Sequence, residues 1–249
     1  MSSSQELEWR LRAFINAPEN FLDSIGFVNA IHSFPVFASQ TPYAIEVEGQ
    51  VVTPVFTNKS DLEIFKQEQE SAKNQEWTER TCLEVLEEVI VKGISGIIFN
   101  IKKDGDFGNS TIFKSSEFIE FLNYFTNILN QVMGEKNLDA DTLDKYYFVP
   151  VFIHPKQESG YDRLYPTMST PDHKSYVPVF SSPKSLARWY NHEEFGGPFR
   201  EAVGSILAWT PNEIYQTDDG DNNIDDTVGI VVNPFDQDQI LINWSDIEE

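Results

Sequence analysis

A short phrase, proline followed by valine and phenylalanine, occurs four times in the chain and constrains its fold more than any other feature. The four occurrences are Pro35-Val36-Phe37, Pro54-Val55-Phe56, Pro150-Val151-Phe152 and Pro178-Val179-Phe180. The first and third are 115 residues apart and the second and fourth are 124 apart, so they pair as two copies that differ by a nine-residue insertion. Similarity that recurs at a nearly fixed spacing indicates a duplicated structural unit.

The similarity between the two copies continues beyond this phrase. Phe56-Thr57-Asn58 corresponds to Phe180-Ser181-Ser182, the strand-like segment 96–100 to 229–233 at an offset of 133, and segment 112–118 to 241–247 at an offset of 129. We therefore predict an α+β fold made of two tandem copies of one module, each a mixed or antiparallel sheet packed against helices. The expected domains are an amino-terminal helix (1–17), copy one (18–133) and copy two (134–249).

Hydrophobic periodicity places the main elements. Apolar runs at 146–153, 176–180, 96–101 and 229–233 are expected to be strands, because their β-branched and aromatic residues suit a half-buried sheet. Asn58 and Ser182 are expected to cap helices. The pattern predicts helices at 5–14, 18–31, 81–91 and 116–133, and a counterpart of helix 81–91 at 199–207 with Phe199, Val203, Ile206 and Leu207 facing inward. Segment 135–144, which is polar and acidic, is the expected linker.

The order of these elements resembles the amino-terminal domain of the SseB family, named for enhanced serine sensitivity. The resemblance rests on a helix, a Pro-Val-Phe strand, a hairpin into a second such strand, and a later strand that begins Gly-Ile and ends in asparagine. It covers residues 20–118 and 146–247, and segments 68–81 and 154–175 depart from it. The family implies an α+β sheet with helices against it, in proteins mostly without an established activity, and it supplies no catalytic residues.

The charge of the chain limits its partners. Asp and Glu total 40 against 18 Lys and Arg, giving a formal net charge of −22. Phosphate backbones and anionic membranes are repelled by such a protein, so neither nucleic acid nor membrane is an expected partner. Another protein is the expected partner, and it could carry a basic surface, since charge of this sign steers cations and basic surfaces towards it. Simple solubility is the favoured explanation of the charge, and attraction of a basic partner is the alternative.

Cysteine usage and the amino-terminal sequence bear on location. Cys82 is the only cysteine, so no intramolecular disulfide can form, and a reducing cytoplasm is the expected compartment. Segment 1–12 carries Glu6, Glu8, Arg10 and Arg12 where a secretory signal needs an uninterrupted apolar core, and no later stretch is long enough to span a bilayer.

Cys82 is also the one candidate thiol nucleophile. The resemblance to the SseB family, whose name is loosely associated with sulfur chemistry, raises the possibility of a sulfurtransferase. A reactive thiolate needs a partly exposed, electropositive environment. Here the residue lies on the apolar face of a predicted helix with Glu84 nearby and Arg80 as the adjacent cation, so a core position is favoured over a catalytic one.

The four histidines do not form a recognisable metal motif. None pair at the i, i+4 or short-loop spacings of a metal site, so no metal and no cofactor is expected. His154 and His173 flank one insertion, which leaves a polar cluster of these two as a candidate. No serine lies in a Gly-x-Ser-x-Gly elbow and no glycine-rich phosphate loop follows a strand.

An acidic loop near residue 220 is the remaining candidate site. Its carboxylates are those of Asp218, Asp219, Asp221, Asp225 and Asp226. Counted from Asp219, the sixth position is Ile224 instead of glycine and the twelfth is Ile230 instead of glutamate, so the calcium-loop template fails. A solvated acidic loop is favoured, with weak cation binding or protein interaction as the alternative.

These observations favour a non-enzymatic acidic protein-interaction or regulatory module of the SseB type. Two alternatives stay open from the sequence: an enzyme whose acid and base groups come from separate loops, and a small-ligand sensor that binds where the two copies meet.

Overall fold

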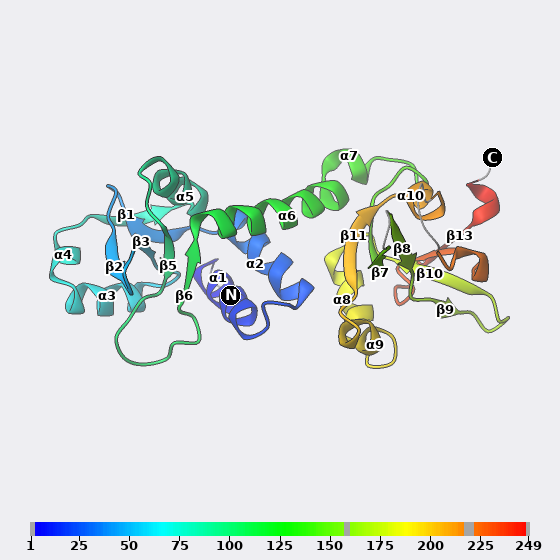
Figure 1. Cartoon of the computed structure of the whole chain (residues 1–249), viewed down its shortest axis with the longest axis horizontal. Coiled ribbons are helices and arrows are strands. Elements are labelled where there is room, and N and C mark those ends of the chain that lie inside the picture. Colours follow the sequence, from blue (N-terminus) through cyan, green and yellow to red (C-terminus); the bar gives the residue numbers. More distant parts are fainter. Residues whose placement is uncertain (1–2, 157–159, 217–221, 248–249) are drawn as a thin grey trace. The chain divides into compact units, whose positions relative to one another are not determined.

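The computed structural model describes residues 3–156, 160–216 and 222–247. The chain divides into two compact units, Met1–Asn127 and Ile128–Glu249, and each is described by itself (Figure 1). Among the described helices none is long and apolar enough to cross a membrane.

The first unit begins with two helices, α1 (Ser3–Asn16) and α2 (Phe21–Ser33). Asn20 caps α2 by accepting hydrogen bonds from the backbone N–H groups of Leu22 and Asp23. The other elements of this unit are β1 (Val36–Ser39), β2 (Ile45–Val47), β3 (Gln50–Val55), α3 (Lys59–Glu68), α4 (Glu70–Lys73), β4 (Trp77–Arg80), α5 (Cys82–Val91), β5 (Gly96–Phe99) and β6 (Thr111–Lys114). Helix α6 (Ser115–Met133) begins in this unit, and its residues from Ile128 onward belong to the second.

The strands of the first unit form a four-stranded sheet and a two-stranded sheet that are connected to each other. A four-stranded mixed sheet has the order β2-β3-β5-β6, in which β3 and β5 are parallel and the outer pairs are antiparallel. An antiparallel pair, β1-β4, joins this sheet through a bridge between Phe37 and Phe56, whose backbones exchange hydrogen bonds of 2.8 and 2.9 Å.

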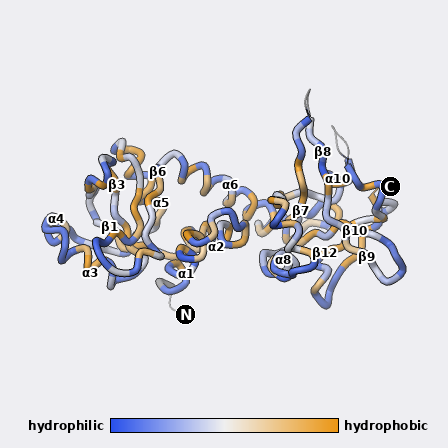
Figure 2. The backbone as a smooth tube through the Cα atoms, turned by 60° about the horizontal axis from the view of Figure 1, so that its bottom comes forward, coloured by the Kyte–Doolittle hydropathy of each residue, from blue (hydrophilic) through white to orange (hydrophobic). Residues whose placement is uncertain are grey.

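Aromatic side chains build two packed regions in this unit. On one, Phe27 of α2 contacts Phe99 and Phe113 of the sheet at ring-centroid distances of 6.1 and 6.0 Å. On the other, Phe65 of α3 packs against Phe56 at 5.2 Å and against Trp77 at 6.0 Å. Hydrophobic residues colour much of these strands, whereas α4 is hydrophilic (Figure 2).

The second unit repeats this plan. A four-stranded sheet has the order β13-β12-β10-β9, with β10 and β12 parallel, and β7 pairs antiparallel with β11 and β8. The elements are α7 (Glu135–Leu138), β7 (Tyr147–Pro155), β8 (Tyr161–Leu164), β9 (Met168–Ser169), β10 (Ser175–Val179), α8 (Pro183–Tyr190), α9 (Gly196–Glu201), β11 (Ser205–Trp209), α10 (Pro211–Tyr215), η1 (Ile224–Asp226), β12 (Gly229–Val232), β13 (Ile240–Asn243) and η2 (Trp244–Asp246).

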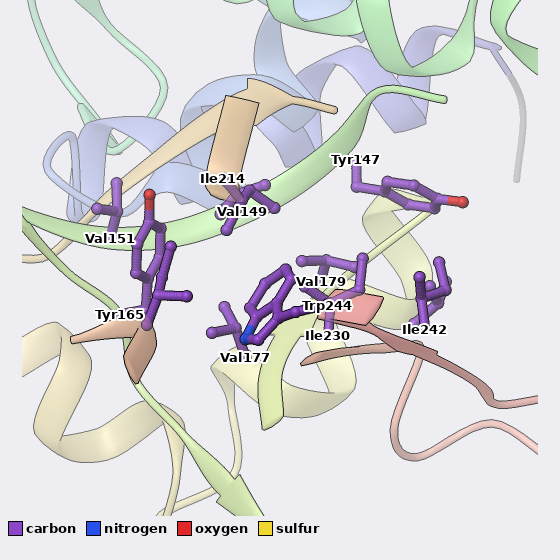
Figure 3. Close-up of a cluster of buried hydrophobic side chains, with 12 residues drawn as sticks. Tyr147, Val149, Val151, Tyr165, Val177, Val179, Ile214, Ile230, Ile242 and Trp244 are labelled. Atoms are coloured by element: carbon purple, nitrogen blue, oxygen red, sulfur yellow. The ribbon is translucent and has the colours of Figure 1, made fainter. Parts of the chain in front are cut away.

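The core of the second unit surrounds Trp244. In Figure 3 its indole lies among Val177, Val179 and Ile230, which come from the parallel pair β10 and β12. The indole N–H donates to Thr227 Oγ1 at 2.9 Å, so the one polar atom of this ring is satisfied inside the core.

The matching strand orders confirm that the fold is α+β and consists of two tandem copies of one module. β1, β4, β2, β3, β5 and β6 correspond to β7, β11, β9, β10, β12 and β13. The bridge between Phe37 and Phe56 recurs between Phe148 and Phe180, with backbone hydrogen bonds of 2.8 and 3.0 Å. The predicted offsets of 124, 133 and 129 residues hold in the strand registers of β3/β10, β5/β12 and β6/β13.

The predicted pairing of the first strands is wrong by four residues. Phe37 corresponds to Phe148, which makes the equivalent bridge, and not to Phe152, which packs on Phe199 of α9 at 5.2 Å. β7 carries phenylalanines at both positions, and a shift of four residues keeps every side chain on the same face of a strand. Hydrophobic pattern alone therefore does not distinguish the two alignments.

The helix predicted at 199–207 is also wrong beyond residue 201. Residues 205–209 form β11, which pairs with β7 in the way that β4 pairs with β1, and Val203 is 84% exposed. The counterpart of α5 is α10: Thr81 with Glu84, and Thr210 with Glu213, form the same reciprocal capping box 129 residues apart. The apolar residues at 199, 203, 206 and 207 have the spacing of a helical face. The segment nevertheless contains the end of a helix, a turn and a strand.

Two equivalent glycines let neighbouring strands approach closely. A Cβ atom on Gly96 would lie 2.1 Å from the carbonyl oxygen of Phe113, and one on Gly229 would lie 2.0 Å from that of Ile242. Any side chain at these positions would collide with the adjacent strand, so glycine is required for packing.

Candidate functional site

The most polar region of the first unit lies where the parallel strands β3 and β5 end. Thr57 and Asn58 follow β3, and Asn100 to Lys102 follow β5, so these residues meet at one edge of the sheet. Ligand sites of α/β sheets often form at the carboxyl ends of parallel strands. The residues at this edge are therefore the first candidates for a functional site.

Asn100 organises this edge. Its backbone has a positive φ of 48°, a conformation that asparagine tolerates better than most residues. Its side chain is fully buried: Oδ1 accepts from the Thr57 backbone N–H at 2.8 Å, and Nδ2 donates to Thr57 Oγ1 and to the carbonyl of Asn109, each at 2.9 Å. Asn100 thus joins the ends of both strands and the loop before β6.

Asp61 and Lys102 form a nearly buried ion pair beside it. The distance from Lys102 Nζ to Asp61 Oδ1 is 3.0 Å, and their side chains are 11% and 5% exposed for Asp61 and Lys102. Burial opposes ionisation of Asp61, but hydrogen bonds from Asn58, Lys102 and Asn109 and the Lys102 charge outweigh it and lower the pKa of the carboxyl below its ordinary value. The carboxylate of Asp61 therefore stays ionised beside Lys102 inside the fold.

Glu8 of α1 attaches the amino-terminal helix to the same cluster. It accepts hydrogen bonds from Thr57 Oγ1, from Asn58 Nδ2 at 3.1 Å and from Asn109 Nδ2 at 2.6 Å. Arg12, one turn later, donates to Glu8 at 2.9 Å and to Asp106 at 2.6 Å. These bonds satisfy the Glu8 carboxylate within the protein. We call the residues joined in this way the polar cluster: Glu8, Thr57, Asn58, Asp61, Asn100, Lys102 and Asn109. The polar cluster holds the fold together, and its side chains are bonded to one another, so it presents no free base or nucleophile.

A cavity of about 500 Å³ opens beside this cluster. It lies between β2, the end of α3 and the loop after β5. Its lining residues are Ala44, Ile45, Glu46, Val47, Phe65, Glu68, Gln69, Ser71, Ile101, Lys102 and Lys103. Ile45, Phe65 and Ile101 belong to the apolar cluster of the unit and give the cavity a hydrophobic surface. Glu68 accepts a hydrogen bond from the Lys103 backbone N–H at 3.2 Å. A cavity of this size and mixed lining is large enough for a small ligand or a peptide side chain.

The second unit has a smaller version of the polar cluster. Asn233 has a φ of 52°, accepts from the Ser181 N–H at 3.0 Å and donates to Ser181 Oγ at 2.8 Å. Asp236 accepts from Ser185 Oγ at 2.7 Å and forms an ion pair with Arg188. The duplicated element is thus the asparagine that locks the strand ends, and the charged groups around it differ between the units.

The prediction that Cys82 is a core residue is confirmed. Its side chain is fully buried in α5, and this burial raises the pKa of the thiol to about 12. A thiol with this pKa is almost entirely protonated at neutral pH, so it lacks the thiolate that a sulfurtransferase needs.

The structure does not bring His154 and His173 together through any side-chain contact in its described residues. His154 is exposed on β7, opposite Asp162 of β8, and His173 is exposed in the turn between β9 and β10, where its φ is 62°. The other two histidines have structural contacts: His32 Nε2 lies 2.8 Å from Thr126 Oγ1, and His192 stacks on Phe235 at 5.4 Å.

The acidic loop is described only in part. Asp218, Asp219 and Asp221 lie outside the described residues, and Asp225 and Asp226 are exposed in the short helix η1. Asn223, just before that helix, is bonded to the backbone N–H and C=O of Tyr165 at 2.8 and 2.9 Å. Within the described ranges no group of three or more His, Cys, Asp or Glu residues is arranged to hold a metal ion.

Sequence reasoning missed the polar cluster and the cavity. From the sequence, the residues of this cluster are predicted only to end a strand or to cap a helix. Their partners are distant in the sequence: Glu8 lies 92 residues and Asn109 lies 9 residues from Asn100. One usable feature was present: asparagine ends both the 96–100 and the 229–233 segments, which points to a backbone conformation that needs it.

No family model and no curated protein matches the chain. Two solved structures are similar. "Anabaena Tic22 (protein transport)" is 14% identical with a TM-score of 0.21 over 92% of this chain and 93% of that one, and "Tic22 from Plasmodium falciparum" is 12% identical with a TM-score of 0.21 over 77% and 86%. At these TM-scores neither likeness carries an argument about fold or function.

Proposed function

We propose that the chain is a non-enzymatic, acidic protein-interaction module of the SseB type that works in the cytoplasm and binds a partner protein with a basic surface. The observation that carries this proposal is the excess of carboxylates in both units. Residues 1–127 hold 19 Asp and Glu against 10 Lys and Arg, and residues 128–249 hold 21 against 8. Because the excess is present in each copy, either copy can attract a basic surface.

The positions of the charges support the same proposal. Exposed carboxylates include those of Glu63, Glu70, Glu84, Glu87 and Glu117. Of these, Glu63, Glu70 and Glu117 have an ion-pair partner three residues away, and such exposed pairs contribute little energy. Because each unit holds about twice as many carboxylates as cations, its net charge stays negative despite these pairs, and a basic partner would be attracted at a rate that depends on ionic strength.

The chemistry of the buried groups favours binding over catalysis. Asp61 and Lys102 pair with each other, the side-chain amides of neighbouring asparagines donate to Asp61 and to Glu8, and Cys82 is a neutral buried thiol. A general base or nucleophile must reach a substrate with a suitable pKa. The groups of the polar cluster are instead committed to joining α1, α3 and the loop before β6.

Affinity capture at graded ionic strength tests the proposal. The full chain is immobilised and exposed to a native lysate at about 50 mM and about 500 mM NaCl, with captured proteins quantified by mass spectrometry. A basic partner retained at low salt and largely lost at high salt is expected. A parallel column with a stable protein of similar net charge serves as the control for non-specific cation exchange. Failure to enrich any protein over that control at any salt concentration would remove the proposal.

A further inference from the structure

β2 forms one edge of the four-stranded sheet in the first unit. Among the described strands its three residues pair with β3 alone, as Ile45 with Val52, Glu46 with Val51 and Val47 with Gln50. The two strands are joined by Glu48 and Gly49, whose φ values of 50° and 78° are those of a two-residue type I′ hairpin. This turn fixes which backbone groups point outward.

The turn makes Val47 and Gln50 a hydrogen-bonded pair, and such pairs alternate along an antiparallel ladder. Ile45 and Val47 therefore direct their backbone groups to β3, while Glu46 directs its N–H and C=O away from the sheet. The Val51 carbonyl, opposite Glu46, points away from β2 and accepts from the Ser95 N–H at 2.9 Å, as this alternation requires. Within the described residues neither backbone group of Glu46 has a hydrogen-bond partner.

The cavity lies along the same strand. Ala44, Ile45, Glu46 and Val47 line it together with Phe65 and Glu68 of α3. Side chains alternate across a strand, so Ile45 and Val47 point to one face of the sheet and Glu46 to the other. Ile45 packs with the apolar cluster that contains Phe65, so its face is the one that borders the hydrophobic part of the cavity.

We propose that the edge of β2 and the adjoining cavity bind an extended peptide segment of a partner protein, which adds to the sheet as a further strand. The backbone N–H and C=O of Glu46 would pair with this strand, as in other cases of strand addition. This inference deepens the proposed function and rests on it, because it identifies where in the first unit a basic partner is engaged.

The geometry also selects the peptide sequence. A strand that pairs with β2 lies about 4.8 Å from it, with its side chains alternating in the same way. Side chains on the face of Ile45 enter the cavity beside Phe65 and Ile101, so they are apolar. Side chains on the other face lie beside the exposed carboxylate of Glu46, so they are basic, since opposite charges are favoured across a ladder. The expected occupant is a segment of alternating apolar and basic residues.

A synthetic peptide provides the probe. A fluorescein-labelled heptapeptide of alternating lysine and isoleucine is titrated with the full chain and followed by fluorescence anisotropy. Two control peptides are matched to it. One has glutamate in place of lysine. The other has every backbone amide N-methylated, which retains the charge and the side chains but leaves no N–H on either edge to pair as a strand.

Variants of the full chain test the edge directly. Glu46→Pro removes the outward N–H without touching a bond to β3, and proline is tolerated on edge strands, so binding is expected to weaken about tenfold. Glu46→Lys reverses the local charge and should weaken binding about threefold or more. Glu87→Lys makes the same change in net charge on α5, outside the cavity lining, and should leave affinity within about twofold. Circular dichroism checks the fold, and if Glu46→Pro unfolds the unit, the N-methylated peptide carries the test.

The outcomes separate this inference from the proposed function. Equal binding of the parent and N-methylated peptides, or unchanged binding by Glu46→Pro, overturns strand addition while leaving a salt-dependent acidic module intact. No binding of the parent peptide by a chain that still retains its partner on the column also overturns it. Loss of both peptide binding and partner retention overturns the inference and the proposed function together.

Discussion

Asn100 and Asn233 occupy equivalent positions in the two units and have nearly the same left-handed backbone conformation, with φ values of 48° and 52°. Each follows the second strand of a parallel pair, donates its own N–H to the partner strand and uses its side chain to fix the residue after a bridging phenylalanine. The same local solution in both units shows that this asparagine is part of the repeated module and not of a feature particular to one copy.

Replacement of either asparagine by alanine should destabilise its own unit, and Asn100→Ala should cost more. The Asn100 side chain makes three buried hydrogen bonds, one of them to the Asn109 carbonyl. Among the described residues the partly buried side chain of Asn233 bonds to Ser181 alone. Alanine removes these hydrogen bonds and is strained at positive φ. The free energy of unfolding of the unit should therefore fall by about 3 kcal/mol for Asn100→Ala and by about 2 kcal/mol for Asn233→Ala. Because a chain of two units need not unfold in a single step, the stability of each unit is measured separately by hydrogen exchange read by mass spectrometry.

Glycine at the same positions separates backbone strain from lost hydrogen bonds. Asn100→Gly and Asn233→Gly relieve the strain and should be about 1 kcal/mol more stable than the alanine variants. Equal protection of the alanine variants and the wild-type chain would contradict the role given to both asparagines.

Gly96→Ala and Gly229→Ala should each destabilise their units, because the new Cβ would lie about 2 Å from a carbonyl oxygen of the neighbouring strand. Separation of the strands to relieve this contact would weaken the ladders β5-β6 and β12-β13, at a cost of about 2 kcal/mol or more. Gly197→Ala is the matched control, since its Cβ would have no neighbour within 4 Å and alanine favours the helix in which it lies. Thermal denaturation would show a lower melting temperature for the first two variants only, and a similar decrease for Gly197→Ala would refute the packing explanation.

The sequence predicts correctly those parts of the fold that are determined by residues close to one another in the chain. The repeated Gly-Ile segments, the caps at Asn58 and Ser182, and helix α6 depend on neighbours close in sequence, and the structure has each of them. The alignment of β7 failed because its two phenylalanines, four residues apart, share one face of the strand, and only the bridge from Phe148 to Phe180 distinguishes them. The helix predicted through 207 failed because strand pairing with β7 overrides local spacing.

The candidate site was much less predictable than the fold. Glu8 reaches Thr57 and Asn109 across separations of 49 and 101 residues, and no periodicity in the sequence records such contacts. The cavity depends on how α3 and β2 pack, which is a tertiary property. The burial of Cys82 was predictable because it lies on the apolar face of α5, and that face packs into the core.

Stability of the first unit should decline at acidic pH through Asp61. Its folded pKa is lowered below the ordinary value of 3.8, so the unfolded chain binds the proton first as the pH falls. The stabilisation is complete above about pH 4 and is lost as the pH falls through the lowered pKa. Denaturant unfolding between about pH 2 and pH 6, read by hydrogen exchange in residues 1–127, measures it. Asp61→Asn should remove this part of the pH dependence, and Asp104→Asn, at an exposed position, should keep it. Identical acid profiles for Asp61→Asn and the wild-type chain would contradict the assignment.

Cys82 should resist thiol reagents for as long as the chain is folded. Burial raises the pKa of its thiol to about 12, so at pH 8 only about one molecule in ten thousand holds the thiolate, and the fully buried side chain also blocks access of the reagent. Modification by a chromogenic disulfide reagent should be about a thousandfold slower in buffer than in denaturant. Leu83→Cys in a Cys82→Ala background is the matched control, because residue 83 is adjacent on α5 and 40% exposed, and it should react at once. Rapid reaction of the native Cys82 in the folded chain would show that α5 opens readily, and it would restore the sulfurtransferase alternative that burial now argues against.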